Sequence, residues 1–185
     1  MSVFRLAWNG VPQWVFHQVA WWCCVLGPEP WGWISMAVFV AVHLGFNRSD
    51  IAPEVLLIAA ATGGGLCVDG CLASSELVRY EGVQRLLGVP LWMLGLWAGF
   101  GATLRHSQRV LVASPTRALW VGAIGGPMAY GGGQGLGRLE IAGLPGFLLI
   151  GLTWALALGL LSWLMNRHQS PASRRESPDG GGTSS

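Results

Sequence analysis

PEVLLIAAATGGGLCVDGCLASSE, residues 53–76, is an apolar segment long enough to cross a lipid bilayer. Gly63, Gly64 and Gly65 interrupt it at the centre, and the acid in its interior is Asp69. No basic residue lies within the segment to pair with that acid. Because an ionised carboxylate is costly in hydrocarbon, Asp69 is the first candidate for a functional site.

The composition of the whole chain indicates a membrane protein. Of the 185 residues, 52% are apolar and 11% are charged, whereas about a quarter of the residues in a soluble domain are charged. All 11 basic residues are arginine, and the net charge of +2 is too small and too scattered to suggest a nucleic-acid partner. The 11 tryptophans suit membrane interfaces, where an amphipathic ring satisfies both phases.

Six prolines each introduce an apolar run, and proline is favoured at the first helical position because its missing N–H would be unpaired there. The sequence therefore predicts an all-α fold, an integral membrane bundle of six transmembrane helices. Residues 12–166 form this domain, preceded by a short N-terminal segment, residues 1–11. The predicted spans are Pro12–Gly27, Pro30–Phe46, Pro53–Ser75, Pro90–Leu104, Pro115–Gly133 and Pro145–Asn166.

The arginines predict the orientation of the bundle, because cytoplasmic segments are enriched in basic residues. An N-terminus in the cytoplasm places eight arginines on the cytoplasmic side and three on the opposite side, which favours two cytoplasmic termini. The three are Arg79, Arg85 and Arg138. Residues 167–185 are rich in Ser, Gly, Pro and Arg, and predict a disordered cytoplasmic tail.

Residues 75–88, between the third and fourth spans, allow two interpretations. The pairs Glu76/Arg79 and Glu81/Arg85 lie at helical spacing, which predicts a short amphipathic helix on the outer surface. A solvated charged loop fits the same residues equally well.

Asp69, Tyr130 and Gln134 form a candidate cluster toward the outer leaflet, because counting along their helices places all three at a similar depth. One interpretation is an acid that is hydrogen-bonded or protonated inside the bundle. The other is a group that titrates protons or contacts a substrate. The sequence leaves both open.

His17 and His43 lie at like depth near the inner leaflet on two adjacent predicted helices, with Gln18 close to His17. Two histidines at one depth suit a metal or a proton relay. No third ligand stands at a recognised spacing, so we favour histidines that are satisfied by neighbouring polar groups and predict neither a metal nor a cofactor.

Two glycine- or cysteine-containing stretches have alternative explanations. Gly126 and Pro127 predict either a broken fifth helix, whose freed backbone lines a site, or a kink with close packing, which we favour. On the third span, small residues at four-residue steps form a ridge for a neighbouring helix: Ala59, Gly63, Cys67, Cys71 and Ser75. A metal site at the two cysteines is disfavoured, because Asp69 points away from both.

The motifs NGVPQWVFHQVAWW, PLWMLGLW and GAIGGPMAYGGGQGLGRLE resemble the bacterial membrane family catalogued as domain of unknown function 2878. The resemblance spans residues 9–166. It implies a multi-pass protein of the bacterial inner membrane and supplies no catalytic residue.

The leading functional hypothesis is a non-catalytic accessory or structural factor linked to membrane-lipid chemistry, with membrane lipids, a membrane-protein partner or a second copy as partners. Few polar groups and ridges of small residues fit helix and lipid contacts. One alternative is a small proton-coupled transporter that uses Asp69, Tyr130 and the break at Pro127. The other is a membrane-embedded enzyme that uses His17 and His43.

Overall fold

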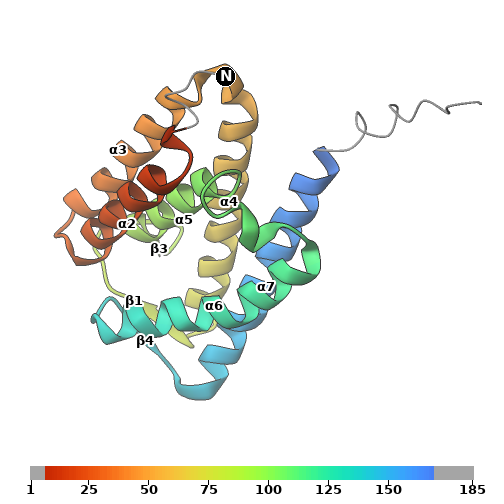
Figure 1. Cartoon of the computed structure of the whole chain (residues 1–185). Coiled ribbons are helices and arrows are strands. Elements are labelled where there is room, and N and C mark those ends of the chain that lie inside the picture. The colour runs from red at the N-terminus through yellow and green to blue at the C-terminus, as the bar shows by residue number, and fades with distance from the viewer. Residues whose placement is uncertain (1–6, 169–185) are drawn as a thin grey trace, which may run out of the picture.

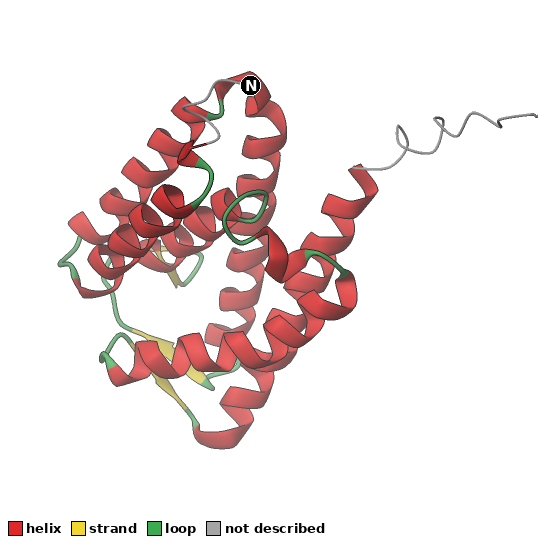
Figure 2. Ribbon diagram, in the orientation of Figure 1, coloured by secondary structure: helices red, strands yellow, loops and turns green. Residues whose placement is uncertain are grey.

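The computed structural model describes residues 7–168, and six long α-helices make up most of that part of the chain (Figures 1 and 2). Each helix end lies within two residues of its predicted position, so the prediction of six helices is confirmed. The predicted tail lies largely outside the described residues. The helices are α2 (Val11–Leu26), α3 (Trp31–Phe46), α4 (Ile51–Ser74), α5 (Leu91–Thr103), α6 (Pro115–Gly135) and α7 (Gly143–His168).

Of the two interpretations of residues 75–88, the amphipathic helix is wrong. The segment instead contains β1 (Val78–Tyr80) and β2 (Arg85–Leu86), and β2 pairs with β3 (Val89–Pro90). Val78 and Tyr80 are buried and Arg79 between them is exposed, which is the two-residue alternation of a strand. Left-handed backbone at Glu76 (φ 60°) also prevents α4 from continuing into this segment.

The helices form two groups that α4 connects. On one side, α2, α3 and α5 pack together against α4; on the other, α6 and α7 pack as a pair (Figure 1). At one end β1 pairs antiparallel with β4 (Leu139–Ile141), so the chain after α4 is joined to the chain after α6. The largest buried apolar side chains between these elements are Met36, Phe39, Leu72, Trp92, Trp97 and Ile150.

Helix α6 is continuous through Pro127, so the hypothesis of a broken helix is wrong and that of close packing is confirmed. A Cβ on Gly122 would lie 2.7 Å from the Cα of Ala155 on α7, and one on Gly126 would lie 2.8 Å from the Cβ of Trp154. The glycines of α6 therefore let its backbone approach α7 closely.

The ridge of small residues on α4 does not pack against another helix of this chain, contrary to the prediction. All five of its members, Ala59, Gly63, Cys67, Cys71 and Ser75, are exposed. Helix α4 turns its opposite face inward, where Leu57, Ala61 and Leu72 enter the core. The ridge is therefore an outer face of the described chain.

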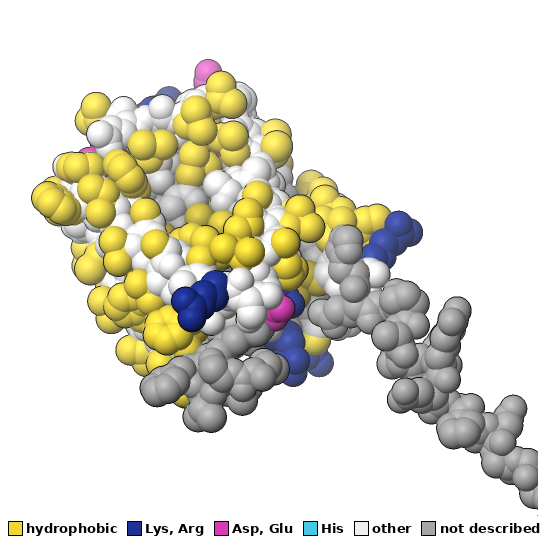
Figure 3. All heavy atoms as spheres, turned by 90° about the horizontal axis from the view of Figure 1, so that it is seen from above, with side chains coloured by type: hydrophobic (Ala, Val, Ile, Leu, Met, Phe, Trp, Pro, Cys, Tyr) yellow, Lys and Arg dark blue, Asp and Glu magenta, His cyan; other side chains and the backbone are white. Residues whose placement is uncertain are grey.

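The exterior is strongly apolar. Five leucines at four-residue steps along α7 are each 57–69% exposed: Leu144, Leu148, Leu152, Leu156 and Leu160. Hydrophobic side chains are spread widely over the face in Figure 3, and only a few charged groups are visible among them. By length and composition, two helical segments are suited to cross a membrane, Arg48–Ser74 and Gly143–Arg167, while α3 and α5 are apolar but shorter. This is fewer than the six predicted spans.

We expect Gly122→Ala to lower the stability of the detergent-purified protein by about 1–3 kcal/mol, because the added methyl group meets backbone of α7 that cannot move aside. The matched control is Gly132→Ala on the same helix, where nothing lies within 4 Å of the new Cβ. The control should be neutral or stabilising by up to about 1 kcal/mol. Thermal unfolding measures both, and equal midpoints would contradict the packing of α6 on α7.

Candidate functional site

Asp69 is completely buried on α4 and accepts hydrogen bonds from three side chains. The hydroxyl of Tyr80 donates to Oδ1 at 2.6 Å, the indole Nε1 of Trp97 donates to Oδ2 at 2.7 Å, and the hydroxyl of Tyr130 also donates to Oδ1. The three donors come from β1, α5 and α6. The carboxylate is thus held by uncharged donors from three separate elements.

Local sequence explains how these donors reach Asp69. Gly65, one turn earlier on α4, has no side chain where the indole ring of Trp97 lies against the helix. The strand alternation of β1 turns Tyr80 inward. Burial, together with Tyr130 and Asp69 nearby, raises the pKa of Tyr80, so its hydroxyl stays protonated and able to donate.

The structure brings together two of the three residues of the predicted outer cluster. Asp69 and Tyr130 are in direct contact, whereas the side chain of Gln134 accepts a hydrogen bond from the backbone N–H of Ile141 at 2.9 Å. Sequence analysis did not find Tyr80 or Trp97. The scarcity of tyrosine was a signal for Tyr80: the chain has only two tyrosines, and both donate to Asp69.

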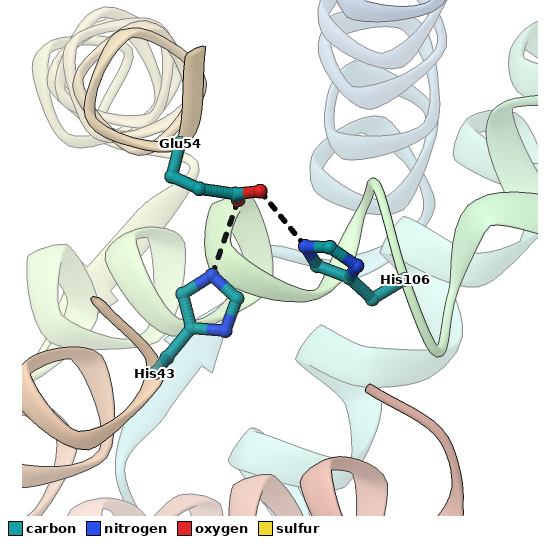
Figure 4. A group of neighbouring side chains, drawn as sticks. All are labelled: His43, Glu54 and His106. Carbon is teal, nitrogen blue, oxygen red and sulfur yellow. Dashed lines mark hydrogen bonds and ion pairs between the residues drawn. The ribbon is translucent and has the colours of Figure 1, made fainter. Parts of the chain in front are cut away.

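A second buried acid, Glu54, lies near the start of α4 and was also missed (Figure 4). Its Oε2 lies 3.1 Å from Nε2 of His43, and its Oε1 lies 2.9 Å from Nε2 of His106. The guanidinium of Arg105 donates to the same Oε1 at 2.7 Å. No local signal in the sequence marked this site, because Arg105 and His106 lie more than 50 positions from Glu54 in the chain.

Hydrogen bonds around His43 determine which of its ring nitrogens carries the proton. Gln13 donates through Nε2 to the carbonyl of Ala102 (3.0 Å) and accepts through Oε1 from the N–H of Ser107 (3.2 Å), which fixes the orientation of its amide. The amide NH₂ of Gln13 therefore faces Nδ1 of His43 at 3.0 Å, and that nitrogen must accept. Nε2 of a neutral His43 then carries the hydrogen and donates it to Glu54.

His43, Glu54 and His106 offer three ligand atoms that lie within 4.8 Å of one another, a spacing that suits a metal ion. A histidine that binds a metal normally donates its other N–H to an acceptor. Here the other nitrogen of His43 faces the donor group of Gln13, and Arg105 adds a positive charge at Glu54. The donor set therefore suits a carboxylate held by hydrogen bonds better than a metal centre.

The ring of Phe39 contacts the rings of both His17 and His43. The prediction that neighbouring polar groups satisfy both histidines is confirmed for His43 and, within residues 7–168, is wrong for His17. His43 joins Glu54, while His17 is 5% exposed and neither of its ring nitrogens has a partner among the described residues. Gln18 is half-buried on α2, and Pro127 is half-buried on α6. Neither residue is among the partners of Asp69 or Glu54.

A cavity of about 260 Å³ lies between the two groups of helices. Its polar lining is confined to a few groups, among them His17 and Tyr130, and the rest is aromatic and aliphatic. Along α6 it follows Val121, Gly125, Ala129 and Gly133, a distance of about 18 Å at 1.5 Å per residue. The aromatic part of its wall is Trp21, Trp92, Trp97, Phe100, Tyr130 and Trp154.

These features define the class of the protein: a helical bundle with an apolar exterior, two buried acids held by donors, and an aromatic cavity. Residues 11–160 match the family described as Protein of unknown function (DUF2878), and the chain belongs to that family, as its motifs predict. A search of the curated proteins finds no match. A search of the solved structures finds none either.

We expect Glu54→Gln to destabilise the protein by about 2 kcal/mol, because one carboxylate oxygen becomes an NH₂ group that faces buried donors. The matched control is Glu140→Gln on the exposed side of β4, for which a change within about 0.5 kcal/mol is expected. Chemical or thermal unfolding in detergent compares the two variants. Equal stability would show that the Glu54 network contributes little.

Proposed function

We propose that this chain is a multi-pass protein of a bacterial inner membrane that binds an apolar chain in its cavity and acts as a non-catalytic accessory factor in membrane-lipid chemistry. A membrane-protein partner or a second copy belongs to the same proposal. The observation that carries it is an apolar exterior combined with several charged and polar side chains that are completely buried.

Several charged and polar side chains are completely buried inside an otherwise apolar core, while many leucine and tryptophan side chains lie outside. Gln13, His43, Glu54 and Asp69 are each 0% exposed, whereas Trp31, Trp120 and Leu148 are each at least 65% exposed. In water such an exterior would be a large aggregation-prone surface. In a bilayer the same exterior contacts lipid, and every buried polar group needs an internal partner.

The cavity supports an apolar ligand. Its lining is almost entirely hydrophobic, with the few polar groups that such sites use to orient a ligand. Its volume of about 260 Å³ is slightly below the ~300–1,000 Å³ typical of ligand pockets, and its elongated course along α6 suits a flexible chain better than a compact metabolite.

The two buried acids support an accessory role over turnover. All four of their carboxylate oxygens accept hydrogen bonds within the bundle. Such carboxylates hold neighbouring elements in register, as expected for an acid that is hydrogen-bonded inside the bundle.

One observation favours a proton-coupled carrier as the second candidate. Tyr130 both lines the cavity and donates to Asp69, so a ligand in the cavity lies one side chain away from a buried acid. A carrier requires that acid to change its protonation state when the ligand binds or leaves.

We expect Gly125→Leu to fill the cavity and remove bound lipid without loss of stability, because Gly125 lines the cavity and has open space beyond it. Leucine is also the better helix former by roughly 0.8 kcal/mol. The control is Gly132→Leu, an exposed position of α6 outside the cavity lining. Mass spectrometry of lipids that co-purify with each variant is the measurement. Equal lipid content in both variants would count against ligand binding in the cavity.

We expect Asp69→Asn to restore the lipid profile of a deletion strain as well as the wild-type protein does. The accessory role needs no titrating acid, and the carboxamide can still accept from Trp97 and donate to the two tyrosine hydroxyls. Lipid extracts of the complemented strains measure this, at matched expression and helix content. If the variant is made and folded but restores nothing, the carrier replaces the accessory factor as the better hypothesis.

A further inference from the structure

We infer that the cavity takes a single-chain amphiphile with an anionic headgroup, a carboxylate or a phosphate, and that Arg138 binds that headgroup. This inference rests on the proposed function and names the chemical class of its ligand. It is carried by the contact of Arg138 with Trp92, which lines the cavity, and by the absence of a hydrogen-bond partner for two of its guanidinium nitrogens among residues 7–168.

Backbone contacts hold Arg138 beside residues that line the cavity, although Arg138 itself is not part of the lining. Its N–H donates to the carbonyl of Gly133 at 3.0 Å, and its carbonyl accepts from the N–H of Glu81 at 2.9 Å. Its guanidinium lies over the ring of Trp92, 5.0 Å from the ring centroid. Trp92, Gly133 and the next residue, Leu139, all line the cavity.

The guanidinium has an unused bidentate edge. Its Nε and Nη2 atoms are buried and have no hydrogen-bond partner in the described part of the chain. These two N–H groups lie on one edge of the planar guanidinium, which matches the spacing of two oxygens in a carboxylate or phosphate. Since a buried charge without a partner is unfavourable, an external anion is the group that completes this edge.

Glu29 does not supply that anion. Its Oε2 accepts from the backbone N–H groups of Val83 (3.2 Å) and Gln84 (3.0 Å), which ties it to the loop between β1 and β2. A Cβ on Gly82 would lie 2.7 Å from its Oε1 and 3.2 Å from Nε1 of Trp92, so the carboxylate is in the same part of the structure. Its Oε1 is buried without a hydrogen-bond partner, and it forms no ion pair with Arg138 within residues 7–168.

The course of the cavity gives the rest of the ligand its shape. From the end near Arg138 it follows Gly133, Ala129 and Gly125 to Val121, about 18 Å along α6. These lining residues are small or aliphatic, which suits a single unbranched hydrocarbon chain. A headgroup at Arg138 therefore places the chain along the aromatic wall.

The test uses quenching of the cavity tryptophans by brominated ligands added to the detergent-purified full chain. The probes are dibrominated stearic acid, its uncharged methyl ester, and an alkyl phosphate brominated in the same chain. We expect the acid or the phosphate to bind at least about tenfold more tightly than the ester. The tighter of the two anions identifies whether a carboxylate or a phosphate is the natural headgroup.

We further expect Arg138→Gln to weaken binding of the preferred anion at least about tenfold, equivalent to 1.4 kcal/mol, and to leave binding of the ester unchanged. The matched control is Arg79→Gln on β1, an exposed arginine at the same end of the bundle. The control should bind all three probes as the wild-type protein does.

The outcomes separate this inference from the proposed function. Equal binding of anions and ester by the wild-type protein overturns the role of Arg138 but leaves an apolar ligand in place. Failure of all three probes to bind overturns both. Should Arg138→Gln not fold, the comparison of acid with ester in the wild-type protein decides the matter without it.

Discussion

The assembly of the bundle depends on the hydrogen bonds that the carboxylate of Asp69 accepts. This carboxylate accepts from Tyr80, Trp97 and Tyr130, which belong to β1, α5 and α6, while it sits on α4. A single buried acid thereby connects the helix group of α2, α3 and α5 with the pair α6 and α7. Without these donors the buried charge would be unfavourable in any solvent, so their geometry and the fold are specified together.

Glu54 is a second buried acceptor at the other end of α4. Its donors are a guanidinium and two imidazoles, whereas those of Asp69 are two phenols and an indole. The difference follows from depth. Arg105 is partly exposed at its end of the bundle, where its charge is solvated as well as paired, whereas Asp69 is fully enclosed and meets only uncharged donors. The central length of α4 between the two acids is apolar and carries Gly65, which gives Trp97 its place.

The sequence was sufficient to predict the helices, because proline positions and apolar runs are local signals. It was insufficient for residues 75–88, where Glu/Arg pairs at helical spacing imitate an amphipathic helix, although β1 is fixed by pairing with β4 some 60 residues later. The same reason explains the sites. Asp69 stood out as a charge in an apolar run, but Glu54 did not, since its partners His106 and Arg105 are more than 50 positions away. Contacts of that range leave no local pattern.

Tyr80 has a consequence for how the protein could respond to its surroundings. The residue belongs to a strand at the end of the bundle, yet its hydroxyl reaches the buried carboxylate of α4. The β1 segment and the enclosed acid are therefore thermodynamically linked. Any molecule that displaces β1 removes the Tyr80 hydrogen bond and thereby changes the proton affinity of Asp69. By reciprocity, a proton arriving at that carboxylate would alter the affinity of the segment for whatever docks on it.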